Sequence, residues 1–140
     1  MRLVIVESPF AGDVDGNRRY LAAALRDCLL RGESPFASHG LYTLPGVLSD
    51  GDPAERRRGI AAGLALAERA DATICYCDRG LSNGMADGLA HAIAWARPVE
   101  FRSLVFGSLS FADARAVLMA SPLRVRDDLL RYLRKSHLTT

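Results

Sequence analysis

Two kinds of hydrophobic pattern alternate along the chain. Short uninterrupted apolar runs are typical of buried strands, and apolar residues recurring every three or four positions are typical of amphipathic helices. The apolar runs predict strands at residues 3–7, 35–42, 72–77 and 98–101. The helical spacing predicts helices at residues 18–31, 53–70, 84–96, 111–119 and 122–135.

The alternation of strands and helices predicts a three-layer α/β sandwich with a parallel sheet, because parallel strands need long right-handed crossovers. We expect a Rossmann-like fold with flavodoxin-like strand order, in which the first strand lies beside the strand at 72–77. Residues 1–104 then form the α/β domain, and residues 105–140 form a C-terminal helical extension of the same domain. Ligands of such folds bind beyond the carboxyl ends of the strands, where the winding direction changes.

Composition narrows the classes of protein that fit. The 140 residues suit one domain, and no apolar run approaches the length of a membrane span. The net charge is only +2, whereas proteins that bind nucleic acid are usually strongly basic, so we do not expect nucleic acid as a partner. Cys28, Cys75 and Cys77 form no CxxC pair, which favours a reducing cytoplasm. The three histidines are widely spread, so we expect neither a metal site nor a cofactor.

The loop after the first strand carries the first candidate chemistry. It reads Glu7-Ser8-Pro9-Phe10-Ala11-Gly12-Asp13 and contains neither a GxGxxG fingerprint nor a P-loop. Pro9 stiffens the turn, Phe10 can stack on a planar base, and Gly12 allows close approach of the backbone. The alternative is a plain connection with Phe10 tucked under the edge of the sheet.

The loop after the strand at 72–77 is also polar and contains glycine. Ser82 is a natural N-cap, which leaves the N–H groups of Asn83, Gly84 and Met85 at the start of a helix. Unsatisfied donors at a helix N-terminus suit a phosphate or carboxylate, although capping alone also explains the serine.

Several titratable side chains are predicted near these loops. Asp78 ends a buried strand and is the acid best placed to bond a ribose hydroxyl or a base, with a structural role as the alternative. Asp87 shares a helix face with His91, so an exposed ion pair is one explanation for it. His39 follows the second predicted strand and can bond a base or transfer a proton, or can be a buried structural histidine.

A run of arginines begins the helix at 53–70. Arg56, Arg57 and Arg58 are typical of a solvated face. Cations are nevertheless unfavourable near a helix N-terminus, so we expect one of them to have an acidic or phosphate partner.

Several of these segments resemble an uncharacterised family found in phages and actinobacteria. The resemblance covers roughly residues 2–104 and rests on the segments Glu7-Ser8-Pro9-Phe10-Ala11-Gly12 with Asn17, Ala37-Ser38-His39, Tyr42 to Leu48, Pro53 to Gly59, Asp78 to Met85, and Arg97 to Leu104. That family is more distantly similar to nucleoside 2-deoxyribosyltransferases and nucleotide N-glycosidases. The resemblance implies a Rossmann-like fold, a nucleoside or nucleotide ligand, and homo-oligomers.

One position departs from the transferase pattern. In the transferases, a Ser-x-Gly turn opens the helix that carries a nucleophilic glutamate four residues after the glycine. Here that position is Gly88, which has no side chain. One possibility is that Asp78, or less readily Asp87, takes over as the catalytic group. Alternatively, water attacks the sugar directly, or the protein binds its ligand without cleaving it.

The sequence thus favours a nucleoside- or nucleotide-binding protein that cleaves or transfers at the N-glycosidic bond. The alternative is a non-catalytic sensor, regulator or sequestering protein. The leucine stripe of the helix at 122–135 also favours a homo-oligomer. The predicted ligand-binding residues are Ser8, Pro9, Phe10, Gly12, Asp13, Asn17, His39, Ser82, Asn83, Gly84 and Met85.

Overall fold

The computed structural model describes residues 1–120 of the chain, and the side chains of residues 1–117. Its strands are β1 (Arg2–Glu7), β2 (Glu33–Phe36), β3 (Ala72–Tyr76), β4 (Val99–Ser103) and β5 (Gly107–Leu109). Its helices are α1 (Val14–Leu30), α2 (Ser38–Leu41), α3 (Pro53–Ala67), α4 (Asn83–Ala94) and α5 (Phe111–Ala120). None of the helices in this part of the chain is both long and apolar enough to cross a membrane.

The strands form a single sheet in the order β2-β1-β3-β4-β5. The first four are parallel, and β5 runs antiparallel to β4. This result confirms the predicted α/β class and the predicted neighbour of the first strand. The winding direction changes between β1 and β3, so the crevice expected for ligands lies at their carboxyl ends.

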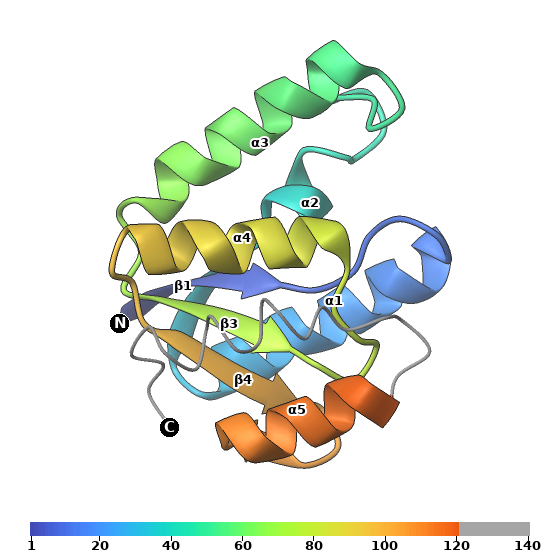
Figure 1. The fold of residues 1–140 in the computed structure, drawn as a ribbon. Helices are drawn as coiled ribbons and strands as arrows, with labels where there is room; N and C mark the ends of the chain where they lie inside the picture. Colours follow the sequence, from blue (N-terminus) through green and yellow to red (C-terminus); the bar gives the residue numbers. More distant parts are fainter. Residues whose placement is uncertain (121–140) are drawn as a thin grey trace.

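Helices cover both faces of the sheet, with α1 on one side and α3 and α4 on the other (Figure 1). Val4, Val6 and Ile74 pack against α1 in one buried cluster. Phe101 and the fully buried Leu89 belong to a second cluster, which joins α4 and α5 to β3 and β4. Because side chains alternate along a strand, Glu7 of β1 faces the α3–α4 side, opposite Val4 and Val6.

The predicted strand at 35–42 is wrong in its second half. The strand ends at Phe36, and α2 begins at Ser38 because Ala37 accepts hydrogen bonds from the N–H groups of Gly40 and Leu41. This turn brings His39 back towards β1.

Two other boundaries differ from the sequence pattern. Helix α1 begins at Val14 rather than Arg18, because the Asp13 carboxylate accepts from the N–H of Gly16 and caps the helix. The short strand β5 was not predicted; it follows a turn in which Ser103 Oγ accepts from the N–H groups of Val105 and Phe106. The predicted helix at 122–135 lies outside the described residues.

Candidate functional site

The loop after β1 is held in place by polar contacts beneath it. Asn17 donates its side-chain amide to the carbonyls of Phe10 and Ala11, at 3.0 and 3.2 Å. Its amide oxygen accepts from Arg79 Nε at 2.8 Å, and Arg79 also pairs with Asp13 at 3.1 Å. Both switch-point loops are therefore tied together through Asn17 and Arg79.

The loop between β3 and α4 places the N-terminus of α4 beside the loop after β1. Ser82 Oγ accepts from the N–H of Met85 at 3.2 Å, which confirms the predicted N-cap. The N–H groups of Asn83 and Gly84 precede the first intrahelical donor of α4, so they remain available to an anion. Both residues are exposed.

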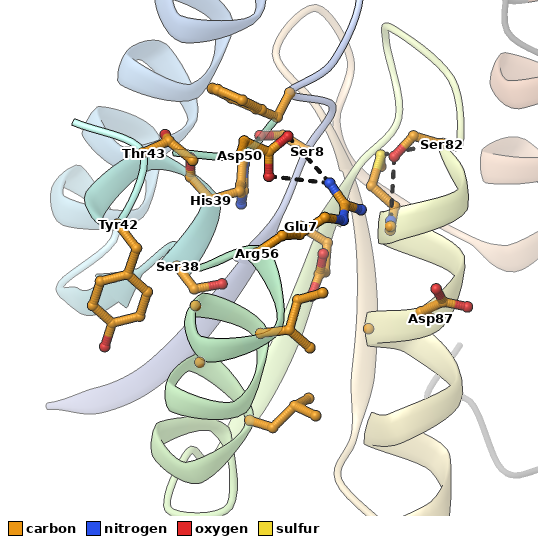
Figure 2. A pocket seen from close by; sticks show the side chains of 18 of the residues that line it. Glu7, Ser8, Ser38, His39, Tyr42, Thr43, Asp50, Arg56, Ser82 and Asp87 are labelled. Atoms are coloured by element: carbon orange, nitrogen blue, oxygen red, sulfur yellow. Dashed lines mark hydrogen bonds and ion pairs between the residues drawn. The ribbon is translucent and has the colours of Figure 1, made fainter. Parts of the chain in front are cut away.

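A pocket of about 680 Å³ opens between these loops, α2, α3 and α4. This volume lies in the range of pockets that hold small organic ligands. Glu7 at the end of β1 lies at its floor, and Arg56 and Ser82 line it from opposite sides (Figure 2). Figure 2 shows Arg56 projecting from α3 across the pocket towards α4.

His39 and Ser8 form a hydrogen-bonded pair on one wall of the pocket. Their Nε2 and Oγ atoms lie 2.8 Å apart. Burial lowers the pKa of His39 to about 4, so the imidazole is neutral near pH 7. The backbone carbonyl of His39 also accepts a hydrogen bond from Thr43 Oγ1, which fixes the turn that carries it.

Glu7 is the acid at the floor of the pocket. Burial is the main cause that raises its pKa to about 8; the charge of Arg97 opposes this rise, and the charge of Asp87 adds to it. Arg97 is itself buried and donates to Thr73 Oγ1 at 2.9 Å and to the Ala67 carbonyl at 2.7 Å. The carboxyl of Glu7 is therefore largely protonated at neutral pH.

Arg56 is the arginine of the 56–58 run that has an acidic partner. Its Nη1 atom pairs with both oxygens of Asp50, at 3.0 and 3.1 Å (Figure 2). The Arg56 side chain is 48% exposed and lines the pocket, so part of its donor fork is open to an incoming ligand.

The structure gathers most of the predicted site residues around this pocket. The predicted residues that line it are Ser8, Phe10, His39, Ser82, Asn83, Gly84, Met85 and Asp87. The predicted residues that do not line it are Pro9, Gly12, Asp13, Asn17 and Asp78. Asp13 and Asn17 support the loop instead of facing the pocket.

Asp78 is engaged in the protein's own hydrogen bonds. Its carboxylate accepts from Tyr20 Oη at 2.7 Å, from Ser103 Oγ, and from the N–H of Leu104 at 2.8 Å. These contacts tie the end of β3 to α1 and to the turn after β4. Asp87, on the other hand, is exposed on α4 at the pocket, and no ion pair joins it to His91 in the described structure.

Three pocket residues, Glu7, Arg56 and Arg97, were not among the predicted catalytic or ligand-binding residues. Glu7 was noted as an acid near the site, but no local pattern showed that it faces α4. Arg56 belonged to the run in which one arginine was expected to have an acidic or phosphate partner, whereas the position of Arg97 depends on tertiary contacts alone. Among the described residues, no cluster of histidine, cysteine and acid is arranged to hold a metal ion.

Solved structures share this fold at low sequence identity. The 2-deoxyribosyltransferase of Bacillus psychrosaccharolyticus is 19% identical, with a TM-score of 0.53 over 93% of this chain and 91% of that one. A conserved protein of Enterococcus faecalis V583 is 12% identical, with a TM-score of 0.55 over 96% and 98%. The CMP N-glycosidase of Clostridium botulinum is 12% identical, with a TM-score of 0.45 over 96% of each chain.

The two likenesses with TM-scores of 0.53 and 0.55 confirm the expected distant similarity in fold. No curated protein matches the sequence significantly. The model of a domain of unknown function, DUF7768, matches residues 2–102, close to the span of the resemblance found in the sequence. Since this match covers most of the chain, the protein belongs to the DUF7768 family.

Proposed function

We propose that the pocket binds a nucleoside or nucleotide and that the protein acts on its N-glycosidic bond. The observation that carries the proposal is the composition of the pocket at the β1–β3 switch point. One enclosed site combines the open N-terminus of α4, the guanidinium of Arg56 and the carboxyl of Glu7. The fold shared with a 2-deoxyribosyltransferase supports the same conclusion.

Each part of a nucleotide has a chemically matched partner in this arrangement. Arg56 and the free N–H groups of α4 suit a phosphate, because both supply donors and positive charge. Phe10 offers an aromatic face for a base. Ser8 and neutral His39 suit sugar hydroxyls, since both can donate and accept hydrogen bonds.

The test is base release from nucleosides and their 5′-monophosphates. The purified protein is incubated with a panel covering the common bases, with ribose and with deoxyribose, and products are separated by chromatography. We expect a free base together with a pentose or pentose phosphate. If every panel member remains intact, the proposed activity is excluded for these substrates.

A specific observation favours a second function, the non-catalytic binding of a nucleotide-derived molecule. Helix α4 carries no side chain at Gly88, so the glutamate nucleophile implied by the transferase resemblance is missing. A sensor or sequestering protein needs only the pocket. Recovery of an intact nucleotide with the purified protein, without base release, would support this function.

We also propose that the protein is a cytoplasmic homo-oligomer. Its three cysteines are free and buried, as in proteins of reducing compartments. Val105 and Phe106, between β4 and β5, are 76% and 72% exposed, and adjacent exposed apolar side chains favour an interface. Light scattering gives the test: a mass of 15.2 kDa at every concentration would reject oligomerisation.

A further inference from the structure

The space beside Gly88 is filled by another part of the chain. A Cβ atom at Gly88 would lie 2.6 Å from the carboxyl carbon of Glu7 and closer still to its Oε1. Such distances are too short for any real contact, so no larger residue fits at 88 while Glu7 keeps its position. The Glu7 carboxyl on β1 therefore occupies the space that a side chain at position 88 of α4 would need.

Glu7 is also open to a ligand. Its carboxyl lines the pocket, and no hydrogen bond joins it to any of the described residues. Glu7 is half-buried, and a half-buried acid that faces a cavity without a hydrogen-bond partner is a candidate for contact with a ligand. The titratable groups around it are Arg56 on α3, Cys75 on β3, Asp87 and His91 on α4, Arg97 before β4, and His39 on α2.

We propose that Glu7 is the catalytic acid of this pocket, occupying the space of the absent residue-88 side chain and protonating the base that leaves a bound nucleoside or nucleotide. This assignment rests on the proposed function. It differs from the transferase arrangement, in which the carboxyl group comes from the helix. Here it comes from the end of the first strand.

The reaction that fits a protonated carboxyl is hydrolysis. The bond between C1′ and the base nitrogen breaks, and its electron pair leaves with the base. Glu7 donates its proton to the base, and a water molecule adds to C1′. The water's surplus proton returns to the Glu7 carboxylate, so the site is restored with one water consumed for each base and sugar released.

A general acid without a carboxylate nucleophile makes no covalent glycosyl–enzyme intermediate. The proposal therefore predicts release of base to water and no transfer of the sugar to a second base. It also predicts a pH profile. Burial raises the pKa of Glu7 to about 8, so turnover falls as the pH rises through this value and the acid loses its proton.

The first experiment compares wild type with Glu7→Gln and with the matched control Glu68→Gln, an exposed glutamate at the end of α3 outside the pocket. Glutamine keeps the shape of the side chain but supplies no acidic proton. We expect Glu7→Gln to lower kcat at least ~10²-fold with little change in KM, and to remove the fall in rate above pH 8. Glu68→Gln keeps the wild-type rate.

The second experiment tests the shared space without relying on activity. Gly88→Ala is made in the wild type and in Glu7→Ala, and midpoint temperatures of unfolding are compared. We expect Gly88→Ala to lower the midpoint when Glu7 is present. It should raise the midpoint in Glu7→Ala, because alanine is a better helix residue than glycine once the clash is gone.

The outcomes separate this inference from the proposed function. Base release by wild type together with its loss in Glu7→Gln supports both. Base release that Glu7→Gln leaves unchanged overturns the role of Glu7 and leaves the proposed function standing. Absence of base release from wild type overturns both the activity and its acid. Additive effects of Gly88→Ala and Glu7→Ala would contradict the shared space by themselves.

Discussion

Ser8 Oγ and His39 Nε2 lie 2.8 Å apart in the wall of the pocket, although 31 positions separate them in the sequence. Ser8 follows β1, and His39 belongs to the short helix α2, which turns the chain back after β2. Burial holds the pKa of His39 at about 4, so the pair is uncharged near pH 7. The Ser8–His39 pair thus offers neutral donors and acceptors to the pocket, whereas Arg56 on α3 offers a charged donor.

Because the Ser8–His39 pair is neutral and Arg56 is charged, variants of the pair should weaken binding without affecting phosphate recognition. We expect Ser8→Ala to reduce affinity for nucleosides and nucleotides alike by about 3- to 10-fold, the value of one neutral hydrogen bond. Calorimetric titration measures the change. Ser34→Ala on β2, outside the pocket, serves as the control. An unchanged affinity in Ser8→Ala would show that this pair does not contact the ligand.

Glu7 predicts an unusual pH dependence of stability. The unfolded carboxyl loses its proton near pH 4.5 and the folded one near pH 8, so between these values the folded state holds one more proton. Raising the pH therefore favours unfolding, by about 1.4 kcal/mol for each pH unit. Urea unfolding of wild type and Glu7→Gln from pH 5 to 8 should show wild type losing stability relative to the variant. A pH-independent difference would refute the shifted pKa.

The fold could be predicted from the sequence largely because its parallel strands are buried. The apolar runs ending at Glu7 and before Asp78 marked β1 and β3, and helical spacing between them implied crossovers. The segment after Phe36 misled because its apolar residues suit a strand, whereas the helical turn of α2 depends on local hydrogen bonds to Ala37. β5 is only three residues long and carries no pattern of its own.

The meeting of the two polar loops could be predicted, but the side chains that face the pocket between them could not. The two polar loops meet as expected, because the carboxyl ends of neighbouring parallel strands share one edge of the sheet. Asp78 was the obvious acid by position, yet Tyr20 and Ser103 use its oxygens. Glu7 faces Gly88 because of the way α4 packs on β1, and no local sequence pattern reveals this packing.

Arg56 predicts discrimination between phosphorylated and unphosphorylated ligands. Arg56→Met removes a guanidinium that can donate two hydrogen bonds to a phosphate. We expect affinity for 5′-monophosphates to fall about 10- to 100-fold, with nucleoside affinity nearly unchanged. The neighbouring Arg57 is exposed and outside the pocket, so Arg57→Met is the matched control in the same titrations. Equal losses for nucleosides and monophosphates would contradict a phosphate contact.

The buried pair of Arg102 and Glu33 predicts a large effect on stability on the opposite face of the sheet. The two groups meet through two hydrogen bonds of 2.7 Å, and Arg102 holds the pKa of Glu33 below its usual range. Arg102→Met should cost about 3–5 kcal/mol of unfolding free energy, because it removes both hydrogen bonds of the buried Glu33 carboxylate and leaves it with the more distant Arg2, 3.9 Å away. The more exposed pair of Arg31 and Asp27 gives the comparison, and Arg31→Met should cost less than about 1 kcal/mol. Denaturant unfolding of both variants measures the two losses of unfolding free energy. Similar small losses in the two variants would refute the large effect expected for Arg102→Met.

Gly84 allows a direct test of whether a nucleoside or nucleotide occupies the pocket between α3 and α4. Gly84 lines the pocket, and a Cβ atom there meets nothing within 4 Å, so Gly84→Leu adds bulk to the pocket without a clash in the fold. Calorimetric titration of wild type and Gly84→Leu is carried out with a panel of nucleosides and 5′-monophosphates, after cooperative unfolding of both proteins has been verified. We expect saturable binding of at least one panel member by wild type and its loss in Gly84→Leu. Absence of binding by wild type, or equal binding by both proteins, would contradict it.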